Sequence, residues 1–190
     1  MYSSEISRYL QQVREITELL NVVDINDLAI QIKDLRSRSG RLFVCGVGGS
    51  SGNASHAVND FRKILGIESY APTDNVSELT ARINDEGWDT SVSNWLEISK
   101  ICKNDAVLIL SVGGGSENTS QNLVKAMELA KQKNAKVLSV VSRDGGVAKK
   151  LSDVCVLVPV VDTNKITPHA EEFQAVIWHM LVTIIGRKDV

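Results

Sequence analysis

The chain has 190 residues, of which 43% are hydrophobic, and its net charge is −2 from 21 basic and 23 acidic residues. This length suits one domain with a sizeable core. The sequence has no basic patch, which argues against nucleic acid as a ligand. No apolar run is long enough to span a bilayer. The N-terminus lacks the layout of a signal peptide, and three widely spaced cysteines, Cys45, Cys102 and Cys155, predict reduced thiols in a cytoplasmic protein.

Two helices are predicted before the first strand. Apolar residues at helical spacing mark 5–20, and a second helical stretch ends near Gly40, which is a suitable C-cap. This helical extension, 1–40, has no sheet of its own to cover. It could pack on the outside of the core or on another subunit, and the sequence leaves both possibilities open.

From residue 41 onward, strands alternate with helices. Strands are predicted at 42–45, weakly at 70–73, and at 106–111, 136–141 and 154–158; helices are predicted at about 52–64, 75–83, 92–98, 117–133, 147–151 and 168–185. The strands are continuous apolar runs, which is typical of a parallel sheet buried on both faces. We therefore predict an α/β fold, a three-layer doubly wound parallel sheet with a helical N-terminal extension, in a single domain, 1–190, whose α/β core is 41–190.

Two of the predicted strands run directly into similar loops of glycine and serine. Loop 46–51 reads Gly-Val-Gly-Gly-Ser-Ser, and loop 112–116 reads Val-Gly-Gly-Gly-Ser. Such loops can bind phosphate through backbone N–H groups, serine hydroxyls and the positive end of the following helix, although ordinary strand–helix turns also contain these residues. Two of them together favour a phosphate site. Neither loop has the lysine of a Walker A motif or a complete GxGxxG, so a small phosphomonoester is favoured over a nucleotide.

Polar residues on the predicted helices suggest a second part of a site. His56 and Asp60 are four positions apart and share a helix face, so they could bind a metal, divide acid and base roles, or form an ordinary surface pair. On the last helix, Glu171 and His179 are eight positions apart and fall near one face, although a lone histidine in such apolar company is often a core residue. The pair Asn84-Asp85 lies in a predicted polar turn, where a helix cap is the ordinary interpretation.

Together these motifs resemble the sugar isomerase (SIS) domain family and, within it, the phosphoheptose isomerases. The resemblance covers nearly the whole chain and rests on Cys-Gly-x-Gly-Gly-Ser at 45–50, His56, Asn84-Asp85, the strand ending in Ser111, Ser116, Asp-Gly-Gly at 144–146 and His179.

The resemblance implies an aldose–ketose isomerase that converts sedoheptulose 7-phosphate to D-glycero-D-manno-heptose 7-phosphate through an enediol. It implies a cytoplasmic homotetramer with active sites between subunits and one Zn²⁺ per subunit, and a phosphorylated sugar as partner without nucleic acid or membrane. The implied metal ligands are His56, Asp60, Glu171 and His179; Asp60 or Glu171 is the implied base, and His179 moves the proton between oxygens. The implied substrate-binding residues are Gly48, Gly49, Ser50, Ser51, Asn84, Asp85, Ser111, Gly113, Ser116 and Glu171.

The chain departs from the family pattern at three places. Asp60 stands where the family usually has Glu, Glu171 stands where it usually has Gln, and the loop that usually reads Ser-Thr-Ser-Gly-Asn-Ser is Ser-Val-Gly-Gly-Gly-Ser at 111–116. Two hydroxyls are lost from that loop, so a bound phosphate would depend more on backbone N–H groups. Two alternatives stay open: a non-catalytic phosphosugar-binding module, regulatory or replication-initiator-binding, and an isomerase of another phosphosugar. The retained acid/base set favours an enzyme.

Overall fold

The computed structural model describes residues 2–187 and contains a five-stranded parallel sheet with the strand order β2-β1-β3-β4-β5. The strands are β1 (Leu42–Gly46), β2 (Ser69–Tyr70), β3 (Ala106–Leu110), β4 (Lys136–Val141) and β5 (Val154–Leu157). The predicted α/β fold with a buried parallel sheet is confirmed. Because all strands are parallel, their carboxyl ends meet at one edge of the sheet, and the loops that follow β1, β3 and β4 lie there together.

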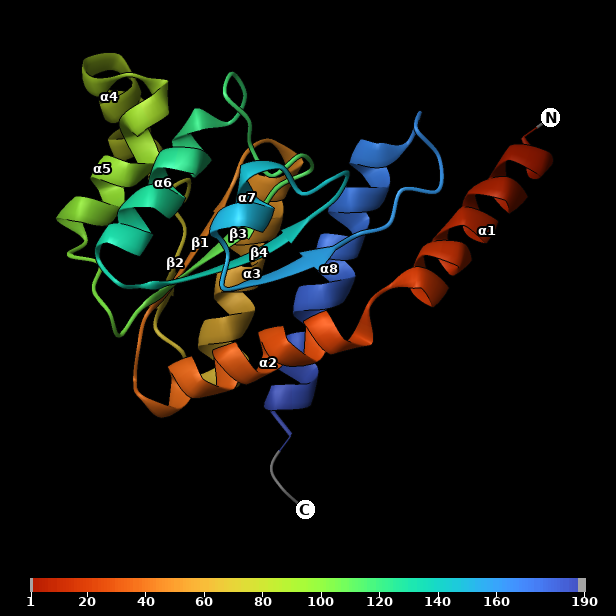
Figure 1. Cartoon of the computed structure of the whole chain (residues 1–190), viewed down its shortest axis with the longest axis horizontal. Helices are drawn as coiled ribbons and strands as arrows, with labels where there is room; N and C mark the ends of the chain where they lie inside the picture. Colours follow the sequence, from red (N-terminus) through yellow and green to blue (C-terminus); the bar gives the residue numbers. More distant parts are fainter. Residues whose placement is uncertain (1, 188–190) are drawn as a thin grey trace.

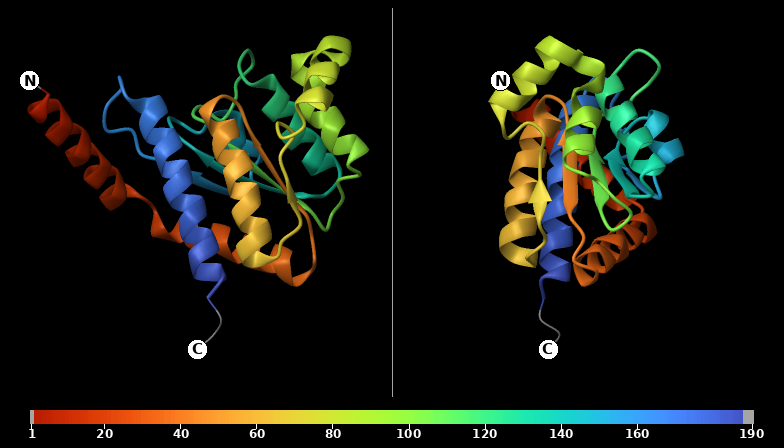
Figure 2. Two further views of the ribbon diagram at one scale, coloured as in Figure 1. Left: turned by 180° about the vertical axis from the view of Figure 1, so that it is seen from behind. Right: turned by 90° about the vertical axis from the view of Figure 1, so that its left-hand side faces the viewer.

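Helices cover both faces of the sheet, as Figures 1 and 2 show. One core cluster lies between the sheet and the helices α2 (Val22–Ser37), α3 (Gly49–Leu65) and α8 (Ile166–Ile185); the other lies between the sheet and α5 (Ser91–Ile98), α6 (Gln121–Gln132) and α7 (Gly146–Leu151). Side chains alternate between the two faces, so Leu108 belongs to the first cluster and its neighbour Ile109 to the second. The predicted three layers therefore follow from strands that are apolar on both faces.

Some element boundaries differ from the prediction. The helix α4 (Val76–Glu86) continues through Asn84-Asp85, which the sequence placed in a turn. Arg82 pairs with Glu78 one turn before it (2.8 Å) and with Glu86 one turn after it (3.3 Å), and these pairs stabilise the helix as far as Gly87. At the other end of the chain, α8 begins at Ile166, which leaves Pro168 in its first turn as predicted.

The N-terminal helix α1 (Ser3–Leu19) projects from the body of the molecule in Figure 1. A chain of polar contacts joins it to the segment before α8 and to the first turns of α8. Gln12 Nε2 donates a hydrogen bond to Asp162 (2.9 Å), Gln12 Oε1 faces His169 Nε2 (3.2 Å), and His169 Nδ1 faces Glu172 (3.2 Å). His169, 2% exposed, is thus buried in the joint between the two helices.

Two further sequence expectations concern the environment of the protein. Cys45, Cys102 and Cys155 are free cysteines. Among residues 2–187, no helix is both long and apolar enough to cross a bilayer.

Candidate active site

The first loop of the predicted site packs tightly at the start of α3. A Cβ atom at Gly46 would collide with the backbone of Ser50, so this close approach needs glycine. A Cβ atom at Gly49 would meet the Glu171 carboxylate, which lies directly against this position. Ser51 Oγ donates a hydrogen bond back to the Gly48 carbonyl (2.7 Å). The Glu171 carboxylate therefore lies against the N-terminal turn of α3, where the helix macrodipole stabilises a negative charge.

Three predicted site residues converge farther along α3 and α8. These helices lie side by side, and His56, Asp60 and His179 each offer a ligand atom within 4.8 Å of the other two. Asp60 Oδ2 lies 3.9 Å from His56 Nε2 and 3.9 Å from His179 Nε2. The helical spacing brings His56 and Asp60 to one face, and the packing of α8 on α3 adds His179.

The orientation of the His179 ring is fixed by its own helix. Its Nδ1 donates a hydrogen bond to the Ala175 carbonyl (2.8 Å), which leaves Nε2 directed toward Asp60. The buried ring of Trp178 lies edge to face with the ring of His56, with centroids 4.7 Å apart. The side chains of His56 and His179 remain 59% and 50% exposed, so a ligand can reach both from solvent.

The second predicted loop lines a cavity of about 440 Å³ at the carboxyl ends of β3 and β4. Ser111, Gly113 and Ser116 line it, as the sequence predicts for substrate-binding residues, together with residues from the loop after β4 and from the start of α8. The N–H of Gly114 donates to Ser111 Oγ (3.1 Å), so the Ser111 hydroxyl keeps its own hydrogen for a ligand. This cavity lies beside the second predicted phosphate loop, and Val47 of the first loop also lines it.

Other predicted site residues lie apart from these two groups. Ser50 is 1% exposed, and its hydroxyl has no hydrogen-bond partner within residues 2–187, so it faces the interior. Asn84 and Asp85 are exposed on the last turn of α4, where Asn84 Nδ2 donates to Asp85 Oδ1 (2.7 Å). Glu171 is on α8 with His179 but does not belong to the group of three potential metal ligands. The roles predicted for these residues remain predictions.

Sequence reasoning missed several residues of the cavity. Arg143 and Asp144 line it from the loop after β4, and Thr119, Ser120 and Thr167 line it from the segments before α6 and at the start of α8. The order of the strands indicates where these residues lie. Because β4 pairs in parallel with β3, the loop after β4 lies beside the loop after β3. The sequence accordingly predicts a third loop, 142–146, at the same end of the sheet, but it does not show that the side chains of Arg143 and Asp144 line the cavity.

Comparisons with known proteins show the family to which this chain belongs. The family model described as SIS domain matches residues 1–142. A phosphoheptose isomerase of Helicobacter pylori (strain Shi470) is 34% identical over 192 residues, which cover 98% of this chain and 95% of the relative.

Solved structures show the same fold. A phosphoheptose isomerase from Francisella tularensis superposes with a TM-score of 0.85 at 23% identity, covering 99% of this chain and 100% of that one. The phosphoheptose isomerase from Neisseria gonorrhoeae gives a TM-score of 0.84 at 22% identity, covering 97% and 99% of the two chains. The resemblance read from the sequence is confirmed: this chain belongs to the SIS-domain family and, within it, to the phosphoheptose isomerases.

Proposed function

We propose that this chain is an aldose–ketose isomerase that converts sedoheptulose 7-phosphate to D-glycero-D-manno-heptose 7-phosphate. The observation that carries the proposal is the convergence of His56, Asp60 and His179 on neighbouring helices. A module that only binds phosphosugars needs the glycine and serine loops but has no use for this acid/base group. The names of the relatives indicate the substrate.

The three converging residues fit a Zn²⁺ site. Two imidazole nitrogens and a carboxylate oxygen are ligands that Zn²⁺ accepts, and a three-residue set leaves a position open for substrate. The His179 ring is oriented by the Ala175 carbonyl, an outer contact that is common for a metal-binding histidine. Zn²⁺ held by His56, Asp60 and His179 would polarise the substrate carbonyl and stabilise the negative charge of the enediolate.

Asp60 is better placed than Glu171 to act as the base. Glu171 and His179 are eight positions apart, which corresponds to about 12 Å along the helix axis. Asp60 instead has one oxygen toward both histidines, while its Oδ1 accepts a hydrogen bond from Asn59 (2.9 Å). With Oδ2 directed toward the two histidines and the metal site, Oδ1 of Asp60 would remove the proton from the carbon next to the carbonyl and return it to the neighbouring carbon. Glu171, against the start of α3, would then bind a substrate hydroxyl.

The fixed ring of His179 limits what this residue can do. Since Nδ1 is committed to the Ala175 carbonyl, only Nε2 is free. That nitrogen can hold a metal or carry a proton between the substrate oxygens, but not both at once. The two roles implied for His179 by the family resemblance are therefore exclusive in any one state of the site.

Proton NMR of the protein with sedoheptulose 7-phosphate in heavy water, with added zinc, tests the function. We expect a new anomeric signal, deuterium on the carbon next to the carbonyl, and loss of both after chelation. Asp60→Asn should abolish deuterium incorporation, whereas Glu171→Gln should retain it and raise KM. Conversion without zinc would exclude the metal site. Broadened sugar signals without conversion would favour a module that only binds phosphosugars. Conversion of another ketose phosphate but not of sedoheptulose 7-phosphate would show that the proposed substrate is wrong.

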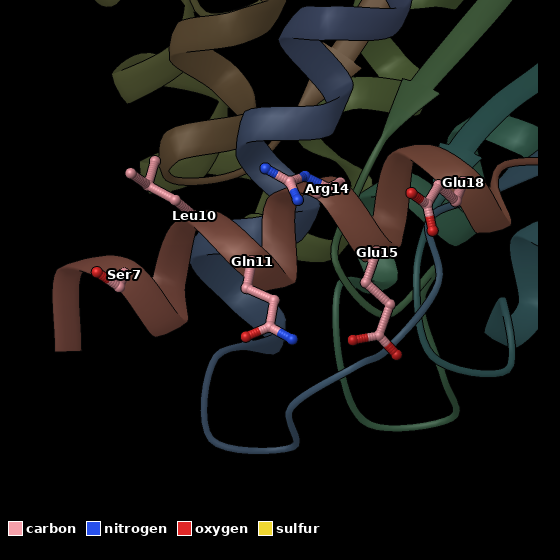
Figure 3. A pocket seen from close by; sticks show the side chains of 6 residues that line it. All are labelled: Ser7, Leu10, Gln11, Arg14, Glu15 and Glu18. Atoms are coloured by element: carbon pink, nitrogen blue, oxygen red, sulfur yellow. The ribbon is translucent and has the colours of Figure 1, made fainter. Parts of the chain in front are cut away.

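We also propose that the chain assembles into a homotetramer with α1 at an interface. The exposed side of α1 carries Ile6 and Leu10, which are 57% and 63% exposed. Beside them, α1 lines a shallow cavity of about 540 Å³, and Figure 3 shows the side chains along it: Ser7, Leu10, Gln11, Arg14, Glu15 and Glu18. Apolar groups with charges of both signs suit a second copy of the same helix, because a two-fold interface pairs a surface with itself. An assembly of this kind could also bring the exposed Asn84-Asp85 of one subunit to the site of another.

Leu10→Glu is expected to shift the protein from tetramer to smaller species at micromolar concentration. Four introduced charges in the assembled protein would have to be buried without partners, which costs far more than the lost apolar contact. Sedimentation velocity measures the change. Ile98→Glu, at a 70% exposed apolar position on α5, is the matched control and should leave the assembly intact. A wild-type protein that sediments as a monomer would contradict the proposal.

A further inference from the structure

The cavity after β3 and β4 lies beside the second predicted phosphate loop but has few groups to balance the charge of a phosphate. Loop 112–115 reads Val-Gly-Gly-Gly and provides no side-chain hydroxyl. Ser111 and Ser116 flank it, and both hydroxyl oxygens accept a backbone hydrogen bond, from Gly114 (3.1 Å) and Asn118 (3.4 Å). Each serine can still donate its own hydrogen, and the hydroxyl residues Thr119, Ser120 and Thr167 also line the cavity. All of these donors are neutral, so they do not balance the two negative charges of a phosphomonoester.

The start of α7 cannot supply the missing stabilisation. The N–H groups of Val147 and Ala148 donate to the carbonyls of the second loop, at 3.0 and 2.8 Å. The N–H of Gly146 donates to Asp144 Oδ1 (3.1 Å), so the carboxylate that lines the cavity caps this helix. These contacts fix the shape of the loop and use the N–H groups that an anion would otherwise need.

Arg143 is the cationic residue that lines this cavity. It occupies the turn closed by the hydrogen bond from Gly145 N–H to the Ser142 carbonyl (3.0 Å), and its φ of 57° is a left-handed conformation that arginine rarely adopts. Its side chain passes over Gly113, since a Cβ at Gly113 would lie 3.9 Å from Arg143 Cδ. Across residues 2–187, the structure gives the Arg143 guanidinium neither an ion pair nor a hydrogen bond. The backbone thus holds an uncommitted cation over the loop.

We propose that Arg143 binds the phosphate of the substrate in this cavity and sets the preference for phosphorylated sugars. The guanidinium donates two parallel N–H bonds to phosphate oxygens, a geometry that lysine cannot copy, while the hydroxyls of Ser111 and Ser116 bind the remaining oxygens. Arg143 replaces in this way the hydroxyl donors that loop 112–115 lacks. This inference rests on the proposed function and adds a residue that determines its substrate class.

Arg143→Ala should raise KM for sedoheptulose 7-phosphate by roughly 10- to 100-fold and change kcat by less than about 3-fold, because a charge-assisted contact to a group far from the reacting carbons is lost. Arg143→Lys should fall between this variant and wild type. The inhibition constant of inorganic phosphate should rise in parallel with KM. Lys150→Ala, an exposed cation on α7 that does not line the cavity, is the matched control and should leave both constants unchanged.

A second variant tests whether the lost contact is the one described. Gly113 has space for a side chain in ordinary contact with Arg143, so Gly113→Ser can be accommodated and adds a hydroxyl to the loop. In the Arg143→Ala background, Gly113→Ser should recover part of the lost affinity for phosphate. If Arg143→Ala had only distorted the turn, Gly113→Ser should not restore the affinity for phosphate.

The result can be separated from the fate of the proposed function. If wild type isomerises the sugar and Arg143→Ala has the same KM and the same phosphate inhibition, the assignment of Arg143 is wrong and the isomerase stands. If wild type has no isomerase activity, thermal unfolding in the presence of inorganic phosphate tests the Arg143 site by itself. A phosphate-dependent rise in Tm that disappears in Arg143→Ala supports the site, and no rise in wild type overturns it.

Discussion

His179→Ala is expected to lower kcat by roughly 10³-fold and to leave the fold intact. A positioned acid/base group contributes about 10²- to 10⁴-fold, and His179 is one of the three converging residues of the site. Its side chain is half exposed, and its hydrogen bond to the Ala175 carbonyl stays within one helix, so we expect its loss to change the free energy of unfolding by less than about 1 kcal/mol. Steady-state kinetics and urea unfolding of the same preparation measure both effects.

The zinc content of this variant separates the two roles that its free nitrogen could fill. If Nε2 binds the metal, His179→Ala should lose zinc along with activity. If Nε2 carries a proton, the variant should retain zinc and still lose activity. Met180→Ala, at the neighbouring and 37% exposed position, is the control and should keep zinc and activity. Full activity in His179→Ala would exclude the proposed isomerase site.

The two parts of this site were predictable from sequence to different degrees. The spacing of His56 and Asp60 placed them on one helix face, and the structure confirms that face. Their meeting with His179 depends on how α8 packs beside α3, a tertiary contact that no local pattern contains. Sequence spacing grouped Glu171 with His179, but two helical turns lie between them, and only the structure shows that the Glu171 carboxylate reaches the start of α3 instead.

Local composition misled the prediction where side-chain pairs one helical turn apart favour the helix. The polar run at 84–88 suggests a turn, but the ion pairs of Arg82 with Glu78 and Glu86 extend the helix through Asn84-Asp85. The strands were easier to predict, because each is a continuous apolar run and a parallel sheet buries such strands on both faces. Arg143 shows a third case: its residue type is unremarkable in sequence, and its importance comes from a left-handed turn beside a neighbouring loop.

The largest effect on stability is expected at Asp105, at the edge of the sheet opposite the candidate site. Asp105 is 2% exposed and accepts hydrogen bonds from the Arg41 backbone N–H (3.0 Å), from Arg41 Nη2 (2.7 Å) and from the Cys102 backbone N–H (3.0 Å). These bonds join the start of β1 to the start of β3. Asp105→Ala should lower the free energy of unfolding by about 3 to 5 kcal/mol, because it leaves the Arg41 charge and two backbone groups without their partner.

The same contacts make the contribution of Asp105 depend on pH. Burial alone would raise the pKa of the Asp105 carboxyl, but the hydrogen bonds from Arg41 and Cys102 and the Arg41 charge outweigh it and lower that pKa below its ordinary value. A carboxyl whose pKa is lower in the folded state stabilises the fold above its unfolded pKa of about 3.9, and this stabilisation is lost as pH falls toward the folded pKa. Wild type should therefore lose stability on acidification below about pH 5, and Asp105→Ala should lose less of it.

Urea unfolding at pH 7 and at pH 4 compares the two proteins directly. Glu97→Gln is the matched control, because Glu97 forms an exposed ion pair with Lys133 (2.8 Å). Such pairs contribute about 0 to 1 kcal/mol, so this variant should unfold near the wild-type midpoint at both pH values. If Asp105→Ala and wild type lost equal stability between pH 7 and pH 4, the acid sensitivity would come from other carboxylates. The expected difference would instead show that the charged Asp105 carboxylate, bonded to Arg41 and to the Cys102 N–H between the amino ends of β1 and β3, stabilises the fold at neutral pH.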